Sequence, residues 1–228
     1  MATRPAPRRL AVALALAVLL AACRTAGAVE DPVVAPSPSQ PTPAAPTGEP
    51  TPRPGLVVGR VPDAPLPLAG GLVLDACAGG RPQILCVRDA DGATLGTVLV
   101  GSGPTGGDHA WLVEDTRDWV EAVGADRRTA CVGRDVATDW QAPVPVAGRD
   151  GVVAGLRVRT AEGVVTDATR SWRVVDGDML AWVTVNAATP DACAPEIEWP
   201  LPPAVLEAIA PAIGELAAGM EVAATDPQ

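Results

Sequence analysis

The chain of 228 residues contains no lysine, phenylalanine or tyrosine, and His109 is its single histidine. Without lysine, the glycine-rich run from Gly101 to Asp108 cannot be a phosphate-binding loop of the Gly-Lys-Ser/Thr type. One histidine and the lack of any Cys-x-x-Cys pair argue against a zinc site. Ser102 has no Gly-x-Ser-x-Gly setting that would mark a nucleophile. We therefore expect no metal, no cofactor and no catalytic residues.

Positive charge is also scarce, since 17 basic residues stand against 27 acidic ones and the net charge is −10. Nucleic-acid binding requires clustered cations that neutralise phosphates. Attraction to anionic lipid likewise requires a basic surface. The composition thus predicts no nucleic-acid partner, and it predicts that any membrane attachment comes from something other than surface charge.

The N-terminus has the pattern of an export signal. Arg4, Arg8 and Arg9 precede an apolar run from Leu10 to Leu20, which is far shorter than the roughly 20 residues of a membrane-spanning helix. Small residues then lead into a cysteine, in the order Leu20-Ala21-Ala22-Cys23.

This stretch resembles the lipobox of bacterial lipoproteins, which implies cleavage before Cys23 and acylation of its thiol. An ordinary secretory signal with an incidental cysteine is the alternative. The resemblance predicts a signal peptide over 1–22 and a lipid-anchored protein on the outer face of the cell membrane. Because three basic residues and no acidic ones precede Cys23, the mature chain would carry a net charge of about −13.

The other four cysteines fit an exported domain. Four cysteines allow three disulfide connectivities, and the sequence alone selects none of them. We favour Cys77–Cys86 with Cys131–Cys193, because the first two lie on short apolar runs joined by a Gly-Gly-Arg-Pro turn. An even number of cysteines in such a domain indicates disulfide bonds and an extracytoplasmic location.

Nine prolines between Glu30 and Pro54 indicate a chain that cannot bury a core. We expect a disordered Pro-rich tether over 23–54, a single globular domain over 55–222 and a tail over 223–228. At about 3.1 Å per residue in an extended polyproline conformation, the tether would hold the domain tens of Å from the bilayer.

Alternation of apolar and polar residues predicts the strands of this domain. A first strand is expected over Leu56 to Val61, and further strands are expected over Leu72 to Cys77, Gln83 to Arg88, Ala93 to Gly101, Val152 to Thr160, Val164 to Val175 and Asp178 to Ala187. Asp89-Ala90-Asp91-Gly92 favours a hairpin turn; it is only a fragment of a calcium loop.

The last three strands should form a meander with one buried and one wet face. Four arginines could then form a basic patch on the wet face, or, as we prefer, could pair with nearby acids; they are Arg157, Arg159, Arg170 and Arg173. The stretch around Cys131 and Trp140 shows no clear pattern.

Two segments have helical periodicity. Leu112, Trp119 and Val120 predict a helix from about Asp108, a plausible cap, to Val123, ending at Gly124. Ala204 to Met220 predicts a second, amphipathic helix that Pro211 should kink or divide.

The order of these elements resembles the PsbP/Mog1-like family, including actinobacterial lipoproteins that carry such a domain. The residues behind the resemblance are Ile84 to Val100, around Arg88-Asp89-Ala90-Asp91-Gly92, and Gly155 to Val185. It implies an α+β fold in which an antiparallel β-sheet is flanked by helices as an α/β/α sandwich. It also implies a binding or assembly module with no catalytic set.

Three functions stay open. The first is a non-enzymatic lipoprotein, expected to be a monomer, that binds an apolar small molecule or an envelope protein; an apolar cleft lined by tryptophan would favour it. The second is an envelope-directed hydrolase with two facing, partly buried carboxylates, for which Asp108, Glu114 and Asp115 are candidates. The third is a structural surface protein with an apolar patch near Trp111 or Trp199. The sequence identifies no ligand-binding residues.

Overall fold

The computed structural model describes residues 55–193 and 199–222. The predicted signal peptide, Cys23, the tether over 23–54 and the tail over 223–228 lie outside the described residues. No helix in the described ranges has both the length and the apolar character needed to cross a membrane.

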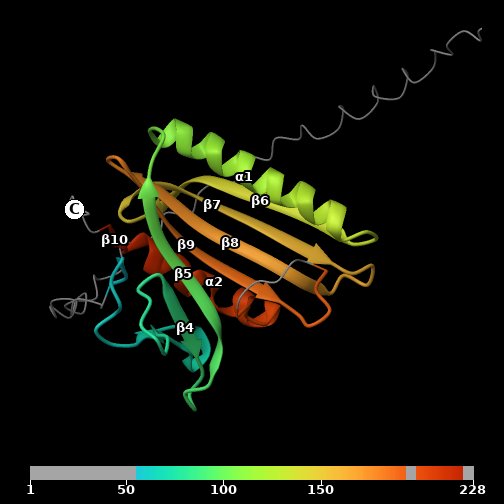
Figure 1. Cartoon of the computed structure of the whole chain (residues 1–228), viewed down its shortest axis with the longest axis horizontal. Coiled ribbons are helices and arrows are strands. Elements are labelled where there is room, and N and C mark those ends of the chain that lie inside the picture. Colours follow the sequence, from blue (N-terminus) through green and yellow to red (C-terminus); the bar gives the residue numbers. More distant parts are fainter. Residues whose placement is uncertain (1–54, 194–198, 223–228) are drawn as a thin grey trace, which may run out of the picture. The chain divides into compact units, whose positions relative to one another are not determined.

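An antiparallel sheet of eight strands forms the centre of the domain, in the order β2-β3-β4-β5-β9-β8-β7-β6 (Figure 1). Its strands are β2 (Leu66–Pro67), β3 (Val73–Ala76), β4 (Ile84–Arg88), β5 (Thr94–Pro104), β6 (Asp135–Val146), β7 (Arg149–Arg159), β8 (Val165–Asp176) and β9 (Met179–Ala188). Tight turns connect β4 to β5 and β8 to β9, and each contains a glycine with positive φ, Gly92 and Gly177. The predicted hairpins and the meander of β7, β8 and β9 are therefore present.

The N-terminal strand is shorter than expected. The prediction of a strand from Leu56 to Val61 is wrong, because β1 covers only Val57–Val58. It pairs in parallel with β10 (Glu221–Val222), at the other end of the domain's sequence. The short 3-10 helix η1 (Ala69–Gly71) lies between β2 and β3.

Helix α1 (His109–Ala130) begins as predicted, because an Asp108 carboxylate oxygen accepts hydrogen bonds from the backbone N–H groups of Ala110 and Trp111. The predicted end at Gly124 is wrong, since the helix continues to Ala130. Gly124 does not end the helix; it allows α1 to pack closely against β6. A Cβ built at this position would lie 2.6 Å from Cγ2 of Thr138 on β6.

Helix α2 (Pro203–Ala218) has Pro203 in its first turn, where a missing N–H costs nothing. Leu206, Ile209, Ile213 and Ala217 form its buried stripe. Pro211 was expected to kink or divide this segment; a division is excluded, because α2 is a single helix with Pro211 in its interior.

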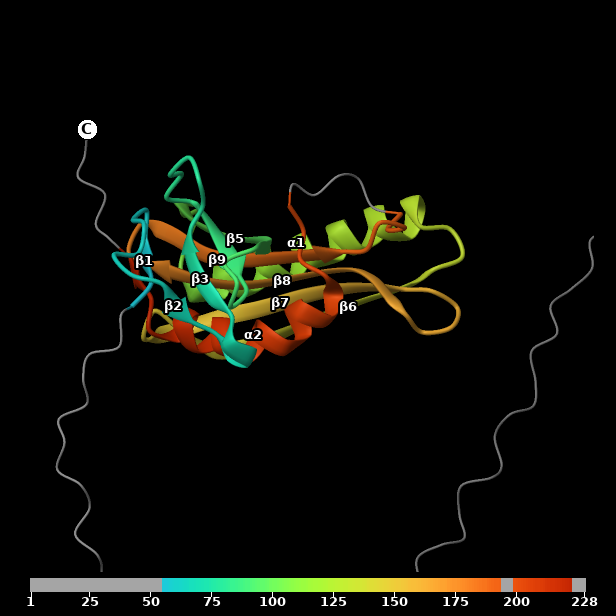
Figure 2. The same cartoon turned by 90° about the horizontal axis from the view of Figure 1, so that it is seen from below.

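The two helices lie on opposite faces of the sheet (Figure 2). On one face, Leu112 of α1 packs with Val152 and Leu180. On the other face, the buried stripe of α2 joins the main core, which includes Trp172, Val174, Val183 and Val185. The fold is thus the α+β class predicted, with an antiparallel sheet between helices.

The expectation that one face of the β7, β8 and β9 meander is exposed to water is wrong, because a helix packs on each face of the sheet. Arg173, predicted to face water, lies under α1, where its Nη1 atom is 3.2 Å from Oδ2 of Asp115. Burial lowers the pKa of Arg173, and Asp115 opposes that shift. Arg170, an odd number of positions away on β8, faces α2 instead. The four arginines therefore do not share one face, because Arg173 lies under α1 whereas Arg157 and Arg170 lie on the α2 side. Arg159, Arg170 and Arg173 each pair with an aspartate.

Strand β6 is an element that the sequence analysis missed. Pro143 and Pro145 interrupt its pattern, and prolines are uncommon in strand interiors. They are tolerated here because β6 is at the edge of the sheet and because its pairing with β7 shifts register between Gln141 and Val144.

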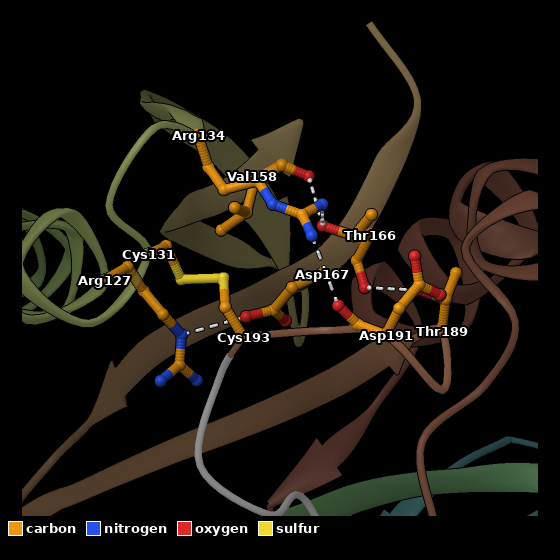
Figure 3. The surroundings of a disulfide bond; sticks show 9 residues. All are labelled: Arg127, Cys131, Arg134, Val158, Thr166, Asp167, Thr189, Asp191 and Cys193. Atoms are coloured by element: carbon orange, nitrogen blue, oxygen red, sulfur yellow. Dashed lines mark hydrogen bonds and ion pairs between the residues drawn. A yellow bond between two sulfur atoms is a disulfide. The ribbon is translucent and has the colours of Figure 1, made fainter. Parts of the chain in front are cut away.

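The structure contains the disulfides Cys77–Cys86 and Cys131–Cys193, which are the pairs favoured from the sequence. The first joins the segment after β3 to β4. The second joins the C-terminal end of α1 to the segment that follows β9 (Figure 3). Two disulfides in a domain of this size are typical of an oxidising, extracytoplasmic compartment.

Candidate functional site

A groove of about 520 Å³ runs between α2 and the three strands β6, β7 and β8. We call it the α2 groove. It lies on the sheet face that carries α2, where side chains from three consecutive strands and from the C-terminal helix converge. Such a concave site, formed where a helix leaves part of a sheet open, has the size of a small-molecule site.

One wall comes from a single stripe of α2. Its residues follow the 3-and-4 spacing that places side chains on one side of a helix, and they are Glu207, Ala210, Pro211 and Gly214. This stripe lies beside the buried stripe of α2, so the packing of the helix onto the sheet also fixes the position of the wall. Small residues at three of its four positions leave the groove open.

The floor and the opposite wall come from the sheet. Period-2 alternation sends Val153 of β7, and Ala168 and Trp172 of β8, toward the α2 groove. Gln141 and Val144 of β6 both line it because the register of β6 shifts between them. The indole of Trp172 is the largest of these side chains, and this residue is only 6% exposed. A Cβ built at Gly214 would lie 3.3 Å from its Nε1 atom, so glycine permits the close contact between α2 and the indole.

An ion pair crosses one end of the groove. Oδ2 of Asp139 on β6 lies 3.5 Å from Nη1 of Arg170 on β8. Between them is Gly155 of β7, where a Cβ would come within 2.6 Å of Oδ1 of Asp139. The absence of a side chain at Gly155 thus lets the carboxylate extend across the middle strand. The guanidinium of Arg170 also lies 6.0 Å from the centroid of the Trp172 ring.

The charges that line the α2 groove balance. Arg157 and Arg170 are opposed by Asp139 and Glu207. Asp139 forms an ion pair with Arg170, and Glu207 is exposed on α2. The lining contains no histidine, cysteine or serine that could serve as a nucleophile or a metal ligand. The chemistry of the groove is therefore that of an apolar surface with a neutral polar rim.

The carboxylates proposed for a hydrolase are not brought together in this groove. Asp108 caps α1, Asp115 pairs with Arg173, and Glu114 is exposed on α1. Ser102 lies in β5 and His109 is the first residue of α1. Across the described ranges, no group of three or more His, Cys, Asp or Glu side chains could hold a metal ion.

The tryptophans proposed for an assembly surface are separated. Trp111 is partly buried against the cluster around Leu112. Trp199 is 64% exposed and lies on the other side of the sheet from Trp172's groove, beside β5. Nothing in the sequence around Trp172 marks it as a binding residue. Its alternation with Arg173 predicted only that it was buried.

A second charged feature lies at the far end of α1. Arg127 Nε is 2.9 Å from Oδ2 of Asp167, whose side chain is fully buried (Figure 3). Neither atom has hydrogen-bond geometry within the described chain, so the contact is an ion pair alone. Burial raises the pKa of Asp167, and the charge of Arg127 opposes the rise. Cys131, one turn along the helix, carries the disulfide to Cys193.

No protein-family model matches the chain, and no curated protein matches it. Among solved structures, it is similar to the solution structure of cyanobacterial PsbP (CyanoP) from Synechocystis sp. PCC 6803, with a TM-score of 0.33 and 11% sequence identity. The similarity covers 65% of this chain and 79% of that chain. A likeness of this strength supports no functional conclusion, and the fold class stands on the chain's own strands and helices.

Proposed function

We propose that the protein is an exported, lipid-anchored lipoprotein whose domain is a non-enzymatic binding module of the cell envelope. The observation that carries this proposal is the α2 groove, an apolar cleft with Trp172 in its lining. Such a cleft favours a binder over a hydrolase or a purely structural protein. A neutral rim favours an uncharged apolar ligand over an ion, because neither sign of charge is in excess.

The anchor is a separate part of the proposal. The Leu-Ala-Ala-Cys stretch supports acylation at Cys23, and the two disulfides support a location outside the cytoplasm. Intact mass of the protein from a lipoprotein-processing host should show Cys23 as the first residue with added acyl chains. A mature Cys23 without acyl mass, or an N-terminus at Met1 or Ala2, would contradict the anchor and leave the groove proposal standing.

Binding in the groove can be tested with N-phenyl-1-naphthylamine, a neutral apolar dye whose fluorescence rises in apolar surroundings. Titration of the purified protein should give saturable binding. Ala210 lines the groove, whereas Ala208 lies on the same helix, is exposed and does not line it. Ala210→Trp should therefore weaken binding at least about tenfold, while Ala208→Trp should leave it unchanged.

Circular dichroism and thermal unfolding of both variants would control for the fold. Equal dye binding by the two variants would contradict a ligand site in the α2 groove. Hydrolysis of envelope polymers by the purified protein, abolished by Asp139→Asn or Glu207→Gln, would favour the enzyme instead.

A further inference from the structure

The sheet face that carries α1 is only partly covered by that helix. Helix α1 packs on β6, β7 and β8, whereas β4 and β5 continue beyond it (Figure 1). On this uncovered part is a second groove of about 500 Å³, which we call the β4–β5 groove. Leu99 faces it from the same side of β5 as Gly101, which contacts the Trp182 ring packed beside α1. The groove is thus on the opposite face from the α2 groove.

The floor of the β4–β5 groove is apolar. Ile84 of β4 and Leu99 of β5 are directly opposed in the strand register, and Leu99 is 36% exposed. The Cys77–Cys86 disulfide lines one side. The backbone oxygen of Trp199 accepts hydrogen bonds from N–H and Oγ1 of Thr97, which holds that residue beside β5. Leu99 and Trp199, which is 64% exposed, thus present apolar surface together at this groove.

Among the described residues, the charged side chains that line the groove are both positive. They are Arg81 and Arg88, and no carboxylate from residues 55–193 or 199–222 lines it. In the described ranges, neither guanidinium forms an ion pair. The Nη atoms of Arg88 donate to the backbone oxygens of Gly92 and Ala76, which are uncharged acceptors. Two positive charges without an ion-pair partner in the described ranges thus lie beside an apolar floor, in a chain whose net charge is −10.

From this arrangement we propose that the β4–β5 groove binds a small amphipathic anion, an alkyl chain that ends in a carboxylate. The alkyl chain lies on Ile84 and Leu99, and the carboxylate accepts charge-assisted hydrogen bonds from Arg81, with the fixed charge of Arg88 nearby. A cation would be repelled by both arginines. This site is on a different face and does not rest on the function proposed for the α2 groove.

The test compares dodecanoate with dodecanol, which share the alkyl chain and differ in charge. Calorimetric titration of the purified protein is done below the micelle concentration of dodecanoate. Dodecanoate should bind and dodecanol should bind at least about tenfold more weakly, since a hydrogen bond to a charged group discriminates by about that factor or more. Arg81→Gln should weaken dodecanoate by a similar factor. Arg81 is exposed and its side chain forms no hydrogen bond or ion pair in the described ranges, so the fold should be unaffected.

Arg128→Gln is the matched control, because Arg128 is exposed on α1 and lines neither groove. It should leave dodecanoate binding unchanged. A Leu99→Asn variant should weaken both ligands. The proposal fails if Arg81→Gln and Arg128→Gln bind dodecanoate equally, or if dodecanol binds as tightly as dodecanoate. It also fails if Ala210→Trp abolishes dodecanoate binding, because the anion would then bind in the α2 groove. A third contradicting result is that anionic vesicles bind in an Arg81-dependent way while dodecanoate does not bind.

Discussion

The ion pair between Arg127 and Asp167 offers the sharpest test of how the α1 side of the domain is held together. The substitution Arg127→Met keeps most of the apolar stem and removes the charge. It leaves the Asp167 carboxylate, which is fully buried, without its only counter-ion in the described structure. Breaking a buried ion pair in this way costs about 3–5 kcal/mol, because the remaining charge is desolvated and unpaired. That is a large part of the 5–15 kcal/mol that a domain usually has.

The sign of the pH dependence follows from the raised pKa of Asp167. With a folded pKa above the unfolded value of about 3.9, the native state binds more protons, so stability falls as pH rises through the folded pKa. Without Arg127, nothing opposes the effect of burial and the pKa should rise further. Arg127→Met should therefore be much more destabilising at pH 7.5 than at pH 4, where the carboxylate can be protonated.

Urea unfolding at both pH values, with the disulfides intact, measures this difference. The double variant Arg127→Met/Asp167→Leu should recover most of the lost stability, because it removes both charges. The exposed Arg128, 3.8 Å from Glu121, is the control, and Arg128→Met should cost about 0–1 kcal/mol. If Arg127→Met costs no more than Arg128→Met, or costs the same at both pH values, the buried pair does not have the role described.

Two further results are expected. Replacing Cys131 and Cys193 by alanine opens a loop with a sequence separation of 62 and should lower the free energy of unfolding in urea by about 4 kcal/mol. Replacing Cys77 and Cys86, whose sequence separation is 9, should lower it by about 2.5 kcal/mol. The reverse order would contradict the loop-entropy reasoning. Gly124→Ala should destabilise by about 1–3 kcal/mol despite its better helix propensity, because its Cβ would meet Cγ2 of Thr138 at 2.6 Å. Thr138→Ser should relieve that cost, and a stabilising Gly124→Ala would refute the close contact.

The antiparallel sheet and both helix starts could be predicted because their signals are local. Alternating apolar residues and the Asp-Gly turns located β4, β5, β7, β8 and β9. Asp108 located the start of α1 through a hydrogen-bonded cap. These features depend on residues within a few positions of one another, so the sequence alone carries them.

The errors arose where distant packing overrides a local signal. Gly124 has the residue type of a helix terminator, but its function is to let α1 approach Thr138. Pro143 argues against a strand, yet an edge position and a register shift accommodate it in β6. The wet face expected for Arg173 is covered by α1. None of these contacts is indicated by a pattern among neighbouring residues in the sequence.

The α2 groove could not be found from the sequence for the same reason. Asp139, Arg170 and Glu207 come from β6, β8 and α2, and only the folded sheet brings them to one groove. Trp172 and Val174 alternate with Arg173, which predicts burial of Trp172 but not a binding role. The one usable signal was the stripe of small residues on α2, and that pattern also fits ordinary helix packing.

Binding of an apolar ligand in the α2 groove can be followed by NMR through the indole N–H resonances of the six tryptophans, during titration with N-phenyl-1-naphthylamine. A Trp172→Phe variant assigns its resonance. We predict a saturable shift of the Trp172 indole signal, with the Trp111 and Trp199 signals unmoved. No shift at Trp172 while the dye binds, or a shift confined to Trp199, would contradict the account.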